Sequence, residues 1–273
     1  MKKIFKNIAN FFVYFFNRFL FSFNAGRYLQ DLILEKISKN HLCINYNKIK
    51  LIIYTPNRLC YWRAKTFLTK EPETINWINE FKENDQFWDI GSNIGLYSCY
   101  AAKRRINVIS FEPSVFNLEI LAKNIYENNL ESLVTIIPVA LSNSTQIKSF
   151  NMSNINYGGA MSSLEKTLFN QDGIKLKKVF NYNLLSMEIK KLSSLLKLKS
   201  PDYIKIDVDG IEHLIIENLD GLIYKTKSIL VEVDIKFQKN LISIEKFLTN
   251  NQFYLKDSYQ GSKNQFNQIW YRK

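Results

Sequence analysis

The sequence predicts an α/β fold built on a mostly parallel sheet, and three observations support this prediction. A short apolar strand at Gln86–Ile90 is followed at once by a glycine turn and the start of a helix. Apolar strands then alternate with helical segments, which is the pattern of parallel strands joined by crossover helices. Near the C-terminus, Phe253–Lys256 and Phe266–Tyr271, around Gln260-Gly261-Ser262, instead predict an antiparallel hairpin.

Residues 1–40 predict a basic and aromatic helical extension before this sheet. Nine aromatic side chains lie within residues 1–23, and Lys3 and Asn10 begin a narrow polar stripe that recurs every seven residues. Such a helix suits the interface of an anionic membrane. Its polar interruptions argue against a spanning helix, and the bulky Phe23 argues against a cleaved signal. The alternative is that this helix packs on the rest of the protein or on a second subunit.

Residues 41–273 predict one further domain. Its first segments, Ile44–Tyr54 and Leu59–Arg63, alternate like strands on either side of a turn. Pro72 predicts a helix over Glu73–Phe81, because proline suits a first helical position. The later strands are expected at Gln86–Ile90, Asn107–Phe111, Val134–Pro138, Tyr203–Asp207 and Ile229–Val233, and the helices at Ile94–Lys103, Val115–Asn128, Glu212–Asn218 and Leu241–Asn250.

A long insert between Ser142 and Leu192 interrupts the alternation of strands and helices. It contains Tyr157-Gly158-Gly159-Ala160-Met161-Ser162-Ser163, whose glycines permit a tight backbone. Inserts of this length are usually functional loops, lids or small added sheets. We expect it to lie over the ligand crevice and to bind the acceptor; the alternative is a structural flap.

The segment Phe87-Trp88-Asp89-Ile90-Gly91-Ser92-Asn93-Ile94-Gly95 predicts a site for an adenosine-containing cofactor. Gly91 and Gly95 let the backbone turn and approach a ligand closely. The N–H groups of the following helix face such a ligand. Glu112 ends the next strand, about twenty residues on, where an acid can accept hydrogen bonds from both ribose hydroxyls.

The same segment favours S-adenosylmethionine over a dinucleotide. Asn93 and Leu96 stand where a dinucleotide motif needs glycine, and no P-loop lysine is present. Asp89 would repel a pyrophosphate but suits the amino group of S-adenosylmethionine. The alternative is an ordinary strand, turn and helix in which Asp89 caps a helix or pairs locally.

A second group of polar side chains follows the predicted strand that ends near Asp207, at the edge where open α/β sheets bind ligands. A carboxylate there can orient an acceptor hydroxyl or remove its proton. Glu212 also suits a helix start, where negative charge is favoured. Which acid acts as the base is left open by the sequence. The candidate catalytic residues are Asp207, Asp209, Glu212 and His213.

From about Pro56 to Val233 the chain resembles the FkbM family of S-adenosylmethionine-dependent methyltransferases. The matching stretches are Trp62-Arg63, Lys70-Glu71-Pro72-Glu73-Thr74, Phe87 to Gly95, Phe111-Glu112-Pro113, Ala140-Leu141-Ser142 and Lys205-Ile206-Asp207-Val208-Asp209-Gly210-Ile211-Glu212. Asp209 stands where the family more often has glutamate. The resemblance implies a Rossmann-like class I methyltransferase sheet, with seven mostly parallel strands and a C-terminal antiparallel hairpin.

The resemblance also implies roles for further residues. Ala140 and Leu141 would contact adenine, and Asn117 would support the ribose site. Glu71 would either touch the methionine part of the cofactor or only start a helix, and Arg63 would bind an anionic group or lie on the surface. The expected cofactor-binding residues are Glu71, Asp89, Gly91, Ser92, Asn93, Gly95, Glu112, Asn117, Ala140 and Leu141.

The expected function is therefore O-methylation of a hydroxyl on a sugar, glycan or related natural product. The net charge of +12 predicts an anionic partner or surface. A nucleic-acid methyltransferase is one alternative, but Ile206-Asp207-Val208-Asp209 is not the Asn-Pro-Pro-aromatic loop of many base methylators. A non-enzymatic, membrane-associated protein with a degenerate cofactor fold is the other.

Three cysteines without paired spacing predict neither disulfides nor a metal site, and they favour a reducing compartment. We therefore expect a cytoplasmic protein, with the inner face of the membrane as the place where residues 1–23 would bind. The sequence predicts no oligomeric state.

Overall fold

The computed structural model describes residues 2–164, 175–261 and 264–273. Contacts divide the chain into two units, Met1–His41 and Leu42–Lys273, which are described separately. The first unit is a pair of helices, α1 (Lys2–Phe21) and α2 (Asn24–Ile37). Met1 lies outside the described residues. Among the described residues, none of the helices is both long and apolar enough to span a membrane.

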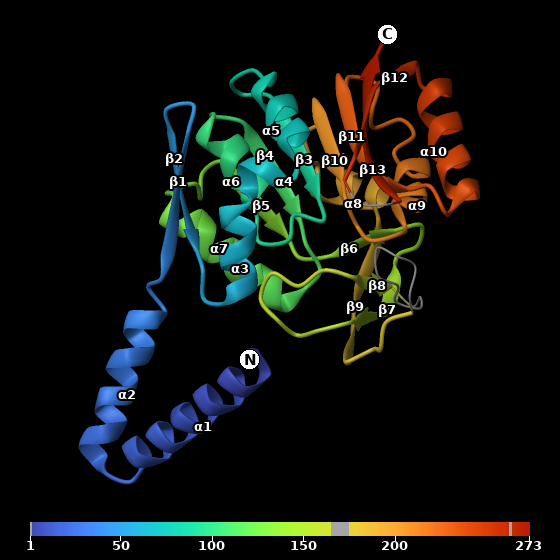
Figure 1. Cartoon of the computed structure of the whole chain (residues 1–273). Helices are drawn as coiled ribbons and strands as arrows, with labels where there is room; N and C mark the ends of the chain where they lie inside the picture. Colours follow the sequence, from blue (N-terminus) through green and yellow to red (C-terminus); the bar gives the residue numbers. More distant parts are fainter. Residues whose placement is uncertain (1, 165–174, 262–263) are drawn as a thin grey trace. The chain divides into compact units, whose positions relative to one another are not determined.

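The second unit is built on a seven-stranded sheet in the order β12-β13-β11-β10-β3-β4-β5 (Figure 1). Strands β3, β4, β5, β10 and β11 of this sheet are parallel, and β12 and β13 form an antiparallel hairpin beside β11. This sheet confirms the predicted fold class. Its strands are β3 (Gln86–Ile90), β4 (Asn107–Phe111), β5 (Val134–Ile137), β10 (Tyr203–Ile206), β11 (Ser228–Asp234), β12 (Phe253–Gln260) and β13 (Gln265–Arg272).

The chain changes direction across the sheet between β3 and β10. From β3 it continues through β4 to β5, and β10 then returns to pair with the other side of β3. In open α/β sheets, ligands bind outside the carboxyl ends of the strands at such a switch point. The topology of the sheet therefore predicts a ligand site next to Ile90 and Ile206, the last residues of the two central strands.

Helices cover both faces of the sheet. The hydrophobic core on one face includes side chains from α3 (Arg58–Lys65), α4 (Phe67–Lys70), α5 (Pro72–Asn79), α6 (Leu96–Lys103) and α7 (Val115–Glu127). The core on the other face includes α8 (Ile189–Leu196), α9 (Glu212–Glu217) and α10 (Gln238–Asn250). Because side chains alternate along a strand, each central strand contributes to both cores.

The prediction for the segments before α5 was partly wrong. The expected strand over Ile44–Tyr54 is a hairpin of β1 (His41–Tyr46) and β2 (Ile49–Tyr54), whose turn residues both have positive φ. The expected strand over Leu59–Arg63 is helix α3. The Asn57 side chain accepts a hydrogen bond from the Cys60 N–H at 2.8 Å and so caps this helix. The alternating apolar pattern after Asn57 predicted a strand, so the capping role of Asn57 was not recognised.

The insert forms a second sheet with the strand order β6-β9-β7-β8. Its strands are β6 (Ala140–Ser142), β7 (Gln146–Met152), β8 (Ser162–Leu164) and β9 (Phe180–Glu188). Residues 165–174 of the predicted insert, and Ser262 of the predicted hairpin turn, lie outside the described residues. Most side chains of β6 and the last part of β7 are buried, so this small sheet is packed against the main core.

Candidate active site

The backbones after β3 and β10 come into close contact at Gly91. Gly91 has a φ of +85°, and a Cβ at this position would lie 1.9 Å from the carbonyl oxygen of Asp207. Only glycine fits here without separating the strand ends. Gly95, with a φ of +78°, caps α6, and a Cβ there would collide with Leu121 of α7. Both glycines of the predicted turn are thus required by the geometry.

Three cavities adjoin at this point, and Gly91 lines all of them. We call them the apolar, amide and charged cavities. All three are open to solvent, and because they share Gly91 they form one continuous crevice. The apolar cavity is lined by Ile90, Gly91, Phe111, Pro113, Val139, Ala140, Leu141, Phe150, Ser162, Ser163, Leu164, Val208 and Ile211.

Glu112 and Asn117 line the amide cavity, together with residues of the insert. The Glu112 carboxyl group accepts hydrogen bonds from the N–H groups of Asn93 and Ser114, both at 2.8 Å. Burial nevertheless raises the pKa of Glu112 to about 7. The carboxyl group is thus held rigidly at the cavity wall, where its remaining lone pairs can accept further hydrogen bonds.

The glycines of the insert are bonded directly to this cavity. The Gly159 carbonyl oxygen accepts hydrogen bonds from the side-chain amides of Asn93, at 2.8 Å, and Asn117, at 3.1 Å. The Gly158 N–H donates to Asn117 Oδ1 at 3.0 Å, and its carbonyl oxygen accepts from Arg63 Nε at 2.7 Å. The insert therefore does lie over the crevice, as expected from the sequence.

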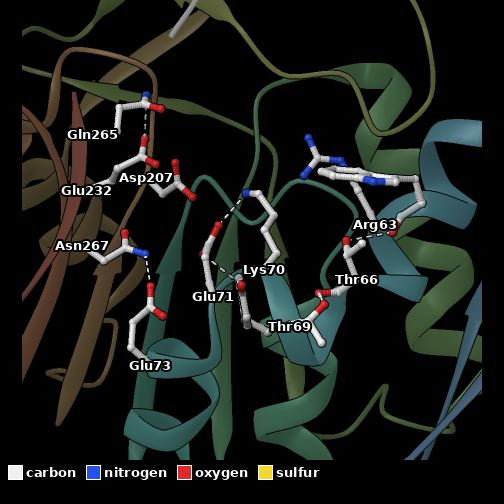
Figure 2. A network of polar contacts seen from close by, with 12 residues as sticks. Arg63, Thr66, Thr69, Lys70, Glu71, Glu73, Asp207, Glu232, Gln265 and Asn267 are labelled. Carbon is white, nitrogen blue, oxygen red and sulfur yellow. Dashed lines mark hydrogen bonds and ion pairs between the residues drawn. The ribbon is translucent and has the colours of Figure 1, made fainter. Parts of the chain in front are cut away.

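The charged cavity combines cations and carboxylates from four parts of the chain. Lys70 Nζ lies 2.5 Å from Glu71 Oε1, as Figure 2 shows, and the Tyr97 hydroxyl donates to the other Glu71 oxygen at 2.9 Å. Lys205 Nζ lies 2.7 Å from Asp207 Oδ2. The cavity is lined by Arg63, Thr66, Phe67, Lys70, Glu71, Gly91, Ser92, Asn93, Ile94, Leu96, Tyr97, Lys205 and Asp207.

Asp89 lines none of the three cavities. It is buried on β3, and its Oδ2 accepts a hydrogen bond from the Ser98 hydroxyl at 2.5 Å. Burial raises the pKa of Asp89, although the nearby Lys205 ammonium acts in the opposite direction. The structure therefore places Asp89 as a support of the turn and of α6.

The four predicted catalytic residues are not all brought together. Asp207 lines the charged and amide cavities, and Asp209 lines the amide cavity. Asp209 accepts a hydrogen bond from the N–H of Met161 at 2.7 Å, so it also holds the insert. Glu212 accepts from the Gly210 N–H at 2.9 Å and holds its own loop. His213 lines none of the three cavities.

Sequence reasoning missed the roles of three residues near the crevice. Lys205 is a fully buried lysine within an apolar strand, which is itself a signal that a charged partner must lie nearby. Tyr97 had no distinguishing pattern on its helix. Glu232 lies in β11 between apolar neighbours, and only the strand pairing shows that it reaches the same edge as Asp207.

The chain is similar to known methyltransferases. Residues 89–260 match the model of the methyltransferase FkbM domain. The chain is 27% identical over 195 residues to the hexuronic acid methyltransferase AglP of Haloferax volcanii, covering 69% of this chain and 74% of that protein. It is also similar to the structure of magnesium protoporphyrin IX methyltransferase from Synechocystis PCC 6803, with 12% identity, a TM-score of 0.47 and coverage of 80% and 85%.

The acids of this site predict how stability depends on pH. Burial raises the pKa of Glu112 and Glu212 to about 7 and that of Asp209 to about 6. Between the unfolded and folded pKa values the folded protein holds more protons, so its stability falls as pH rises from about 4.5 to 7. The pKa of Asp207 is lowered, so this residue affects the free energy of unfolding only below its ordinary pKa of 3.8, where stability falls as the pH falls.

Urea unfolding at pH 5 and pH 7.5 should therefore show a lower free energy of unfolding at the higher pH. In Glu212→Gln the decrease in the free energy of unfolding should be smaller by about 2 kcal/mol, because glutamine does not titrate and each unit of pKa shift corresponds to ~1.4 kcal/mol. Glu217→Gln, at an exposed position of the same helix, should follow the wild type. If Glu212→Gln lost as much free energy of unfolding as the wild type over this pH range, Glu212 would not have a raised pKa in the folded protein.

Proposed function

Because the chain belongs to the FkbM family of methyltransferases, we propose that it transfers the methyl group of S-adenosylmethionine to a hydroxyl group of a sugar or glycan. The family match confirms the resemblance noted in the sequence. The observation that carries the proposal is the set of three adjoining cavities around Gly91, whose different linings suit the different parts of this cofactor.

We assign the adenine ring to the apolar cavity, where Ala140 and Leu141 form part of the wall, and the ribose to the amide cavity beside Glu112. The charged cavity then takes the amino-acid part, with Glu71 facing its ammonium group and Lys70 or Arg63 facing its carboxylate. The Ser92 hydroxyl, which lines this cavity, is buried without a hydrogen-bond partner among the described residues. A ligand polar group would satisfy it.

The remaining predicted residues shape the walls of the cavities or hold the elements that form them. Gly91 and Gly95 shape the turn, Asn93 and Asn117 fasten the insert, and Asp89 positions α6 through Ser98. When bound, S-adenosylmethionine supplies a methyl group on a positively charged sulfur. The chain itself must then align the acceptor hydroxyl and receive its proton.

We propose that the acceptor lies against the acids at the edge of β10. Asp207 lines the charged and amide cavities, whereas Asp209 and Glu212 act as positioning residues because their oxygens bond to loop N–H groups. His213 stays a sequence prediction that the cavities do not support. The relative from Haloferax volcanii is a hexuronic acid methyltransferase by name, and together with the net charge of +12 this supports an acidic saccharide as the acceptor.

A transfer assay tests the proposed reaction. S-adenosylmethionine with a radiolabelled methyl group should label a disaccharide that ends in glucuronic acid at least tenfold faster than maltose. Transfer RNA should take no label. Labelling of RNA in place of either saccharide would instead support a nucleic-acid methyltransferase and overturn the proposed acceptor class.

Binding measurements test the cofactor. Glu112→Ala should weaken S-adenosylmethionine binding by about 1.5–3 kcal/mol, the scale of losing hydrogen bonds to a charged group, or roughly 10- to 100-fold in Kd. Glu119→Ala, an acid on the surface of α7, should bind like the wild type. NAD should produce no thermal stabilisation. Unchanged affinity in a folded Glu112→Ala protein would remove Glu112 from the ribose site.

We also propose that residues 1–23 hold the enzyme at the inner, cytoplasmic face of a membrane. Phe11 and Phe15 of α1 are 62% and 63% exposed, and their rings stack on one another. Exposed aromatic side chains on a basic helix favour the interface of an anionic bilayer. The three cysteines are all unpaired, which supports a reducing compartment.

Vesicle sedimentation checks this proposal. The wild type should sediment with vesicles containing phosphatidylglycerol, and replacing Phe11 and Phe15 together by serine should weaken binding at least tenfold, because each buried phenylalanine contributes about 1.5–3 kcal/mol. Tyr224→Ser, at a position 61% exposed in the second unit, should bind normally. A wild type that stays in the supernatant would favour packing of the helix on protein.

A further inference from the structure

Glu232 lies at the carboxyl edge of the sheet, next to Asp207, which lines the crevice. Strands β10 and β11 pair Ile206 with Val231, so the next residues of each strand, Asp207 and Glu232, are neighbours. Both belong to the set of alternate side chains that faces α3–α7. Figure 2 shows the two carboxyl groups close together, with Glu71 and Lys70 on the other side of Asp207.

The charged groups around Glu232 come from several elements. They are Lys205 and Asp207 at the end of β10, Asp209 and Glu212 of the following loop and helix, Lys70 at the end of α4, and Glu71 and Glu73 at the start of α5. Strand β13 adds the neutral amides of Gln265 and Asn267. Gln265 Nε2 donates to Glu232 at 3.2 Å, and Asn267 donates to Glu73 at 2.7 Å.

The nearby cations already have other partners. In the described part of the chain, Lys205 pairs with Asp207 and Lys70 pairs with Glu71. Although burial acts in the opposite direction, the Lys205 ammonium holds the pKa of Asp207 below its ordinary value. Burial, and then the charge of Asp207, raise the pKa of Glu232 well above its usual range. Asp207 is therefore a poor proton acceptor, while Glu232 has a strong affinity for a proton.

We propose that Glu232 is the catalytic residue that takes the proton from the acceptor hydroxyl, and that the positive sulfur of the bound methyl donor prepares it by displacing the proton that it carries in the free protein. This inference rests on the proposed function. The two carboxyl groups at this edge then have different roles. Asp207, paired with Lys205, orients the acceptor, and Glu232 receives the proton.

The transfer step balances in atoms and charge. The acceptor oxygen forms a bond to the methyl carbon while the bond between that carbon and sulfur breaks. The electron pair of the broken bond stays on sulfur, which becomes neutral, and the hydroxyl proton passes to a Glu232 oxygen. One positive and one negative charge thus disappear together. The product state again contains a protonated Glu232, which its half-buried position among other acids favours.

Calorimetry can measure the release of this proton when the methyl donor binds, without the methyl acceptor present. We would titrate S-adenosylmethionine and S-adenosylhomocysteine into the full-length protein at pH 7, in phosphate and in Tris, whose ionisation enthalpies differ. The wild type should release close to one proton more on binding S-adenosylmethionine than on binding S-adenosylhomocysteine. Because the two ligands share the same amino-acid end, proton exchange at that end cancels in the comparison.

The variants locate the proton. Glu232→Gln should bind S-adenosylmethionine within about threefold of the wild type and lose the extra proton release. Glu73→Gln, which removes another buried acid of the same face, should keep it. Equal release with both ligands, or unchanged release in Glu232→Gln, overturns the inference. A wild type that binds neither ligand would overturn the proposed function itself, which is a distinguishable result.

Methyl transfer provides the second readout. With the saccharide that accepts label, Glu232→Gln should lower kcat at least 100-fold, within the range for removing a general base, while the KM for S-adenosylmethionine changes less than threefold. Wild-type kcat in Glu232→Gln would overturn the inference.

Discussion

The buried ammonium group of Lys205 is the interaction on which the rest of the site depends. Lys205 is only 2% exposed, pairs with Asp207 at 2.7 Å, and lies 5.2 Å from the centre of the Tyr97 ring. Its positive charge also acts on Asp89 and Glu71. An unpaired carboxylate is costly to bury, so a group of acids this dense at the switch point requires such a cation. The lysine lowers the pKa of Asp207, while burial and the neighbouring acids raise the pKa of Glu232.

The sequence was sufficient for the central part of the fold. Strands β3 and β4 have the predicted ends because each is an apolar run closed by a glycine or a proline. The glycine turn and Glu112 were predictable for a related reason, since the backbone conformation restricts the residue types there. By contrast, α3 was mistaken for a strand because an apolar pattern of five residues fits either structure, and the cap at Asn57 decided between them.

The acceptor side of the site was not predictable in the same way. Glu232 lies 25 residues beyond Asp207 in the chain, and nothing local marks it. Its importance arises from the register of β10 against β11 and from the donor that β13 contributes. His213, which looked more promising in the sequence, belongs to a helix whose start is placed by Glu212 and lines none of the cavities. Local patterns identify strand ends, whereas pairings between distant strands determine which side chains meet.

The close contact between Gly91 and the Asp207 carbonyl has a consequence for protein engineering. No larger residue can stand at position 91 without forcing the two central strands apart, so the cofactor side of the crevice offers little freedom for redesign. The insert is bonded to the crevice through backbone atoms of Gly158, Gly159 and Met161, whereas the edge hairpin contributes side chains such as Gln265. Libraries intended to change the accepted sugar should therefore vary side chains of the hairpin and of the insert outside these three residues, and leave the turn after β3 untouched.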